Sequence, residues 1–179
     1  VWNTAHGQIF TLTDPEGEKN VSRFSYHADF LLIFLAPFYF LYSSPITLLI
    51  IQSLVVSLGA IPIYLLCQKV LKSKIISLVF SLSYLLYPAL QRANIYEFHA
   101  VTLVSTFLLL AFYFAFTEKY KLFYLFSFLA MSTKEQIPLL VLGMGIYILF
   151  LKKKIKIGLF TILISLFWFI LTVWVIIPY

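Results

Sequence analysis

Residues 122–151 read LFYLFSFLAMSTKEQIPLLVLGMGIYILFL, two apolar runs separated by the polar stretch 132–136. A bilayer core of about 30 Å requires roughly 20 helical residues. The run 122–131 is therefore half a span, and the run 137–151 is about three quarters of one. Because Lys134 and Glu135 interrupt the apolar sequence, we expect two short helices here rather than one long one.

The lysines flanking this stretch predict how the chain is oriented in a membrane. They cluster at 69–74, 119–121 and 152–156, and basic residues favour cytoplasmic loops. The three clusters lie on one side only if 122–131 and 137–151 each cross the bilayer. We therefore expect the lysine-rich loops to be cytoplasmic and residues 132–136 to be external.

The composition of the whole chain agrees with a membrane location. Hydrophobic residues make up 62% of the sequence and charged residues only 11%, which is typical of a multi-pass membrane protein. Further apolar runs cover 46–67, 75–90, 98–116 and 157–177. We expect an all-α transmembrane helical bundle of about six spans in the cell membrane. The net charge of +6 reflects the loop lysines, and we expect no nucleic-acid partner.

The first 43 residues differ from the rest. Residues 1–27 are polar, and the apolar run 30–42 is short and contains Pro37. We expect 1–43 to be an external segment that carries an interfacial helix, and 44–179 to be the transmembrane domain. The chain starts at Val1 and ends in an apolar run, so we expect it to be a fragment of a longer protein.

The external side collects the varied polar chemistry. Every acidic residue except Glu118 is predicted there, together with all three histidines. Lys134 and Glu135 lie close to membrane depth, where ionisable residues mark functional sites; the alternative is that they only pair with each other. The segment 91–99 is also external.

Three further residues stand close together in that segment. Glu97 and His99 follow Arg92, and a carboxylate, an imidazole and a guanidinium are suited to acid–base work or to a metal with a phosphate. The alternative is a solvated loop in which Glu97 pairs with Arg92 and His99 caps the next helix. Asp29, beside His27, either acts in the site or stabilises the start of the interfacial helix.

Several motifs in order resemble a known family. The stretches are SYHADFLLIFLAPFYFLYSSPITLLIIQSLVVSLGAIPIYLLCQKVLKSK (25–74), YLLYPALQRANIYEFHA (84–100) and STKEQIPLL (132–140). Together they resemble the prokaryotic membrane proteins grouped as DUF2079, over most of the chain. That family has no assigned activity, and the resemblance implies a distant relation to the GT-C membrane glycosyltransferases. These enzymes take sugars from polyprenyl-phosphate donors at the outer membrane face.

The GT-C relation implies roles for the external residues. Lys134 and Arg92 would bind the lipid phosphate, and Glu97 or Asp29 would be the catalytic carboxylate. His27, His99 and Glu97 would hold a divalent metal, Mg²⁺ or Mn²⁺. Glu135, Tyr96 and Asn94 would support the site. The acidic residue that GT-C enzymes carry after their first helix would precede Val1.

Membrane lipids and a polyprenyl-phosphate sugar donor are thus the expected partners. Two other functions remain open. Broken helices with charges at membrane depth also mark transporters, although no internal repeat is evident. A non-catalytic membrane assembly subunit would tolerate exchange of the external charges.

Overall fold

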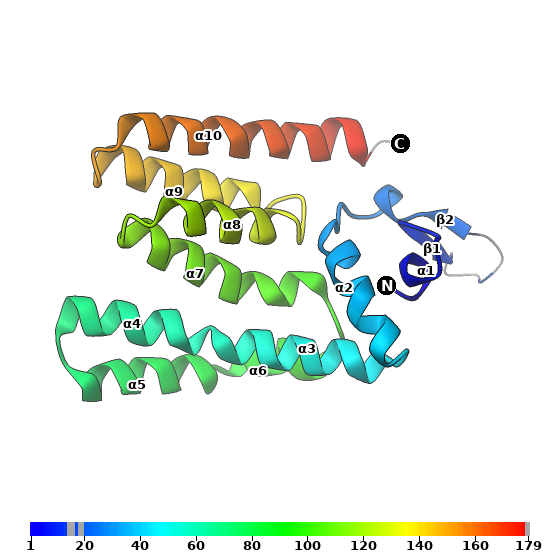
Figure 1. The fold of residues 1–179 in the computed structure, drawn as a ribbon, viewed down its shortest axis with the longest axis horizontal. Helices are drawn as coiled ribbons and strands as arrows, with labels where there is room; N and C mark the ends of the chain where they lie inside the picture. Colours follow the sequence, from blue (N-terminus) through cyan, green and yellow to red (C-terminus); the bar gives the residue numbers. More distant parts are fainter. Residues whose placement is uncertain (14–16, 18–19, 178–179) are drawn as a thin grey trace. The chain divides into compact units, whose positions relative to one another are not determined.

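A computed structural model describes residues 1–13, 17 and 20–177, and nearly all the regular structure there is helical. The elements follow one another along the chain as labelled in Figure 1. Their contacts group into two compact units. We call Val1–Thr47 with Ala130–Tyr179 the first unit, and Leu48–Leu129 the second unit.

The first unit begins with short elements. They are α1 (Trp2–Ala5), the antiparallel strands β1 (Thr11–Thr13) and β2 (Asn20–Ser22), and a 3-10 turn at Arg23–Ser25. The rings of Phe10, Phe24 and Phe30 pack together, with centroids 4.3 Å and 5.3 Å apart for successive pairs. This aromatic cluster joins the hairpin to the start of α2 (Leu31–Leu41). The predicted polar segment is therefore partly folded.

The rest of the first unit is a tight helix pair, α9 (Pro138–Phe150) and α10 (Ile155–Ile170), which lie side by side in Figure 1. Glycines at the contact let the two backbones approach closely. A Cβ on Gly158 would lie 2.7 Å from the backbone nitrogen of Leu149. A Cβ on Gly145 would lie 3.0 Å from that of Ile162. Beyond α10 the chain continues as one π-helical segment, Leu171–Ile176.

The second unit is built from helices alone in the residues described. Its helices are α3 (Pro45–Leu58), α4 (Ala60–Leu71), α5 (Lys74–Leu85), α6 (Pro88–Tyr96), the 3-10 segment Ala100–Leu103, α7 (Val104–Phe116) and α8 (Tyr120–Met131). The first three residues of α3 and the last two of α8 are grouped with the first unit. Side chains bond to backbone carbonyls at the α3–α4 junction. Tyr84 of α5 donates to Val56 O at 3.0 Å, and Thr106 of α7 donates to Val55 O at 2.7 Å.

Several polar side chains lie inside these units together with apolar ones, and many large apolar side chains lie outside. The fully or nearly buried residues include Gln52, Ser77 and Ser81 in the second unit and Thr161 and Ser165 in the first. Large hydrophobic residues are exposed along the same helices, among them Ile50, Leu54, Phe160 and Leu163. A water-soluble protein would bury such residues. Helices in lipid instead pack through small and polar residues.

Two helices are long and apolar enough to cross a membrane, Pro45–Leu71 and Ile155–Ile176. The pair Lys74–Leu85 and Pro88–Tyr96 makes a third if it is one span bent by 43°. Four shorter apolar helices complete the set found in the described residues: Leu31–Phe40, Ala100–Phe116, Tyr120–Met131 and Pro138–Phe150. The structure thus supports two or three candidate spans, and the predicted six crossings remain a proposal.

The predicted run 30–42 does form a helix, and Pro37 lies inside it without ending it. The predicted break within 122–151 is confirmed, because the chain leaves the helical conformation between Met131 and Pro138. The predicted division at residues 43 and 44 remains a prediction, since the two units are defined by contacts and not by the membrane.

Candidate ligand site

The loop between α8 and α9 is held in a defined backbone conformation. Ser132 and Thr133 are fully buried. Thr133 Oγ1 donates to Ala130 O at 2.7 Å, which satisfies a carbonyl at the end of α8. The backbone nitrogen of Leu31, the first residue of α2, donates to Ser132 O at 2.9 Å. Pro138 then starts α9, where its missing N–H costs nothing.

A second contact joins this loop to the segment before α2. His27 Nδ1 lies 3.3 Å from Glu135 Oε1, across 108 positions of sequence. The His27 side chain is 42% exposed, and that of Glu135 is 19% exposed. Glu135 Oε2 is buried and has no hydrogen-bond partner among the residues described. Burying half of a carboxylate without a partner is costly, so this oxygen is unusual.

Lys134 precedes Glu135 and is half-buried. Its ammonium makes no ion pair or hydrogen bond with any residue that the structure describes. Lys134 and Glu135 therefore do not form the ion pair with each other that was the alternative interpretation. The loop presents an unpaired cation beside a carboxylate that has one unpaired oxygen.

Asp29 has a different environment. It is 6% exposed, and its Oδ2 accepts from Arg23 Nη2 at 2.6 Å and from Arg23 Nε at 3.2 Å. The guanidinium thus neutralises the carboxylate through two donors. Its side chain does not cap α2, whose N-cap is Phe30. The pair fixes the turn between the hairpin and α2.

The segment 94–99 of the second unit is organised by one buried amide. Gln52, fully buried in α3, donates through Nε2 to Asn94 O at 3.2 Å and to Glu97 O at 3.3 Å. Its Oε1 accepts from His99 N at 3.0 Å. Gln52 therefore binds three backbone groups of a turn that follows α6. Gln52 is not among the site residues that the sequence predicts.

The charged side chains of that turn face outward. Glu97 Oε1 lies 3.3 Å from His99 Nε2, with the side chains 61% and 51% exposed. Glu97 thus pairs with His99 and not with Arg92, and the His99 side chain does not cap the following 3-10 segment. The Tyr96 ring stacks on that of His99 at a centroid distance of 6.4 Å.

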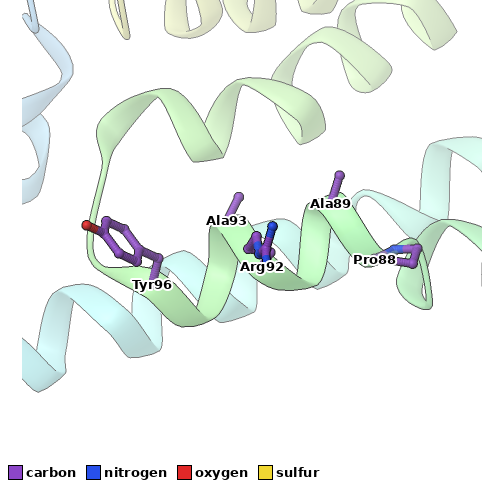
Figure 2. Close-up of a pocket in the computed structure, with 5 residues that line it drawn as sticks. All are labelled: Pro88, Ala89, Arg92, Ala93 and Tyr96. Carbon is purple, nitrogen blue, oxygen red and sulfur yellow. The ribbon is translucent and has the colours of Figure 1, made fainter.

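Arg92 lies on the exposed side of α6, beside a shallow hollow of about 910 Å³ (Figure 2). Pro88, Ala89, Ala93 and Tyr96 complete the lining. Within the described ranges, the guanidinium has neither an ion pair nor a hydrogen bond. Arg92, Tyr96 and the Glu97–His99 pair are therefore gathered at the end of one helix in the second unit.

The predicted site residues thus form two sets, one in each unit. His27, Asp29, Lys134 and Glu135 belong to the first unit, whereas Arg92, Asn94, Tyr96, Glu97 and His99 belong to the second. No group of three or more His, Cys, Asp or Glu able to hold a metal occurs in the described part of the chain. Glu97 and His99 alone do not make a complete ligand set for a metal.

The membrane character of both units agrees with a comparison to known families. A family model described as "Predicted membrane protein (DUF2079)" matches residues 1–179. The chain belongs to the DUF2079 family. The predicted resemblance is confirmed over the full sequence. No curated protein and no solved structure matches this DUF2079 chain.

Proposed function

We propose that this DUF2079 chain acts in a GT-C-like glycosyltransferase, which uses a polyprenyl-phosphate-linked sugar at the outer membrane face. One observation carries the proposal. Lys134 is half-buried without an anionic partner among the described residues, in a non-helical loop between two apolar helices. A partly buried cation favours an anionic ligand. In a membrane, the abundant anion with an apolar body is a lipid phosphate.

The proposed reaction needs the groups that the loop provides. Departure of a lipid phosphate from the sugar develops negative charge on the phosphate oxygens, and a fixed ammonium stabilises that charge. Lys134 supplies such a point charge. Arg92 of the second unit remains a predicted phosphate ligand by itself, because a guanidinium binds phosphate through two donors and that of Arg92 has no partner among the described residues.

The proposal includes a topology of six crossings. The lysine clusters at 69–74, 119–121 and 152–156 would be cytoplasmic, and the segments 1–43, 91–99 and 132–136 external. The short helices α7, α8 and α9 would then each cross or enter the bilayer. Lys134 would face the external side, where lipid-linked sugars are consumed by GT-C enzymes.

Ligand-dependent unfolding of the detergent-solubilised protein tests the proposal. Undecaprenyl phosphate should raise the unfolding temperature of the wild type, because a ligand of the folded state adds about 2.7 kcal/mol at 100 times its Kd. Lys134→Ala should abolish the shift. Lys153→Ala, at an exposed loop lysine beyond α9, is the matched control and should retain it.

Added Mg²⁺ or Mn²⁺ in parallel titrations tests the metal prediction separately. A shift that appears only with the cation would place a divalent ion in the complex. A folded wild type that shows no shift with undecaprenyl phosphate under either condition would contradict the transferase proposal. The transporter and assembly-subunit functions would then be favoured.

A further inference from the structure

The candidate carboxylates differ in what they are free to do. Asp29 is neutralised by two donors of Arg23 on one oxygen. Glu97 is 61% exposed and paired with an exposed histidine, and such solvated pairs are weak. Glu135 is the most distinctive: one oxygen lies against His27, and the other is buried and unpaired among the described residues.

The surroundings of Glu135 fix the direction of the carboxylate. The loop backbone is held by the bond from Leu31 N to Ser132 O, and the side chain by the contact from His27 Nδ1 to Oε1. Both contacts come from the segment that leads into α2. With Oε1 occupied by His27, Oε2 is left as an acceptor without a partner among the described residues. Lys134 is the preceding residue of the chain, so its Cα is about 3.8 Å from that of Glu135.

We propose that Glu135, rather than Asp29 or Glu97, is the carboxylate that meets the ligand held by Lys134. The inference rests on the proposed transferase function and names its base. His27 is a positioning residue, because it acts through Glu135. A buried polar oxygen that lacks a partner in the free protein gains one when a hydroxyl group binds.

In the proposed transfer, the acceptor oxygen forms a bond to the anomeric carbon of the sugar. The bond from that carbon to the lipid phosphate oxygen breaks, and its electron pair leaves with the phosphate. The acceptor hydroxyl proton goes to Glu135 Oε2. Lys134 stabilises the departing phosphate. The step is a substitution without net oxidation or reduction.

Labelling with a hydrophobic carbodiimide, read by mass spectrometry, tests where Glu135 points. The protein in detergent is treated with dicyclohexylcarbodiimide with and without undecaprenyl phosphate. We expect Glu135 to be labelled, and the lipid to slow its labelling at least tenfold. In Lys134→Gln the label should remain and the protection should disappear. Asp29, buried but bound to Arg23, is the internal control and should not react.

Turnover tests the base itself. Release of undecaprenyl phosphate is measured from a panel of donors in which a hexose is joined directly to undecaprenyl phosphate, with membranes containing the acceptor. Glu135→Gln should lower release at least 100-fold while undecaprenyl phosphate still shifts the unfolding temperature. Glu135→Asp should restore part of the rate, and His27→Asn should lose less than His27→Leu because its amide can replace Nδ1.

The outcomes separate the two proposals. Lys134-dependent lipid binding without labelling or protection of Glu135 would overturn the inference and leave the proposed function standing. Release that survives Glu135→Gln would do the same. A wild type that neither binds undecaprenyl phosphate nor releases it from any donor would overturn the proposed function, and the assignment of Glu135 with it.

Discussion

Gln52 is an uncharged side chain, yet it holds the turn of the second unit that carries Glu97 and His99. Gln52→Leu would leave the carbonyls of Asn94 and Glu97 and the N–H of His99 without their partner. Each unsatisfied buried group costs about 1–3 kcal/mol. We expect a lowered unfolding temperature and faster amide hydrogen exchange at 94–99, both measurable in detergent.

Ser53 provides the matched control for Gln52. It is exposed on the same helix, and among the described residues its hydroxyl hydrogen-bonds only to the Asn94 side chain, accepting from Asn94 Nδ2 at 3.1 Å. Ser53→Ala should therefore leave the exchange rates at 97–99 unchanged. Equal effects of the two substitutions would show that the amide of Gln52 does not hold the turn.

Substitution of Arg23 or Asp29 should lower the stability of the protein rather than its ligand binding. Removing one partner leaves the other as an uncompensated charge, which costs about 3 kcal/mol or more when the pair is buried. Arg23→Leu and Asp29→Leu should each lower the free energy of unfolding. The double variant should lose less than the sum of the two, as measured by a double-mutant cycle.

Undecaprenyl phosphate should still bind Asp29→Asn at a temperature where that variant is folded. Loss of lipid binding by the folded variant would instead return Asp29 to the ligand site that the sequence predicts.

At this scale the sequence identified the unusual residues but not their partners. Lys134, Glu135 and Glu97 were conspicuous because charge interrupts apolar runs. The partner of Glu135 is 108 positions away, and that of the 94–99 turn is in α3. No local spacing rule relates positions so distant. Nor does local spacing show that the Lys134 side chain has no partner among the described residues.

At the scale of elements, the α9–α10 contact depends on two glycines. Gly158→Ala would place a methyl group 2.7 Å from the Leu149 backbone nitrogen, which cannot rotate away. Overpacking of this kind costs about 1–3 kcal/mol. We expect a lower unfolding temperature for Gly158→Ala and, by the same reasoning, for Gly145→Ala.

Gly143 lies on α9 as well, but nothing stands within 4 Å of where its Cβ would be. Gly143→Ala should be neutral or slightly stabilising, since alanine favours the helix over glycine. If Gly143→Ala and Gly158→Ala shifted the unfolding temperature equally, helix propensity rather than close packing would account for both.

The positions of most helices could be predicted from the apolar runs, because a helix that is buried in lipid or against another helix requires an apolar run of suitable length. Run length does not predict where local backbone chemistry interrupts a helix. The predicted span 75–90 is divided between α5 and α6, since Pro88 begins a new helix after a break at 86–87. The three-residue strands β1 and β2 were missed, as pairs this short carry too few alternating positions to be recognised.

At the scale of the molecule, the distribution of side chains is the strongest evidence for the membrane. In the two longest candidate spans, only 22% and 17% of the most apolar stretches are buried. Serine, threonine and glutamine side chains share the interior with apolar residues such as Phe123 and Ile148. A protein with this surface would aggregate in water. The environment that satisfies it is lipid, as membership of DUF2079 also indicates.

The predicted topology of six crossings depends on whether α9 crosses the bilayer. This helix has 13 residues, about 20 Å at 1.5 Å per residue, so it is shorter than the bilayer core. If α9 crosses, the loops at its two ends lie on opposite sides, with the membrane thinned or the loops drawn inward.

In a Cys67→Ser background, Gln136→Cys should react with a membrane-impermeant maleimide applied to intact cells. Lys153→Cys should react only after the membrane is permeabilised. Reaction of both cysteines from outside would mean that α9 enters and leaves on the same face. The lysine cluster at 152–156 would then be external, and the charge argument for six crossings would fail at that point.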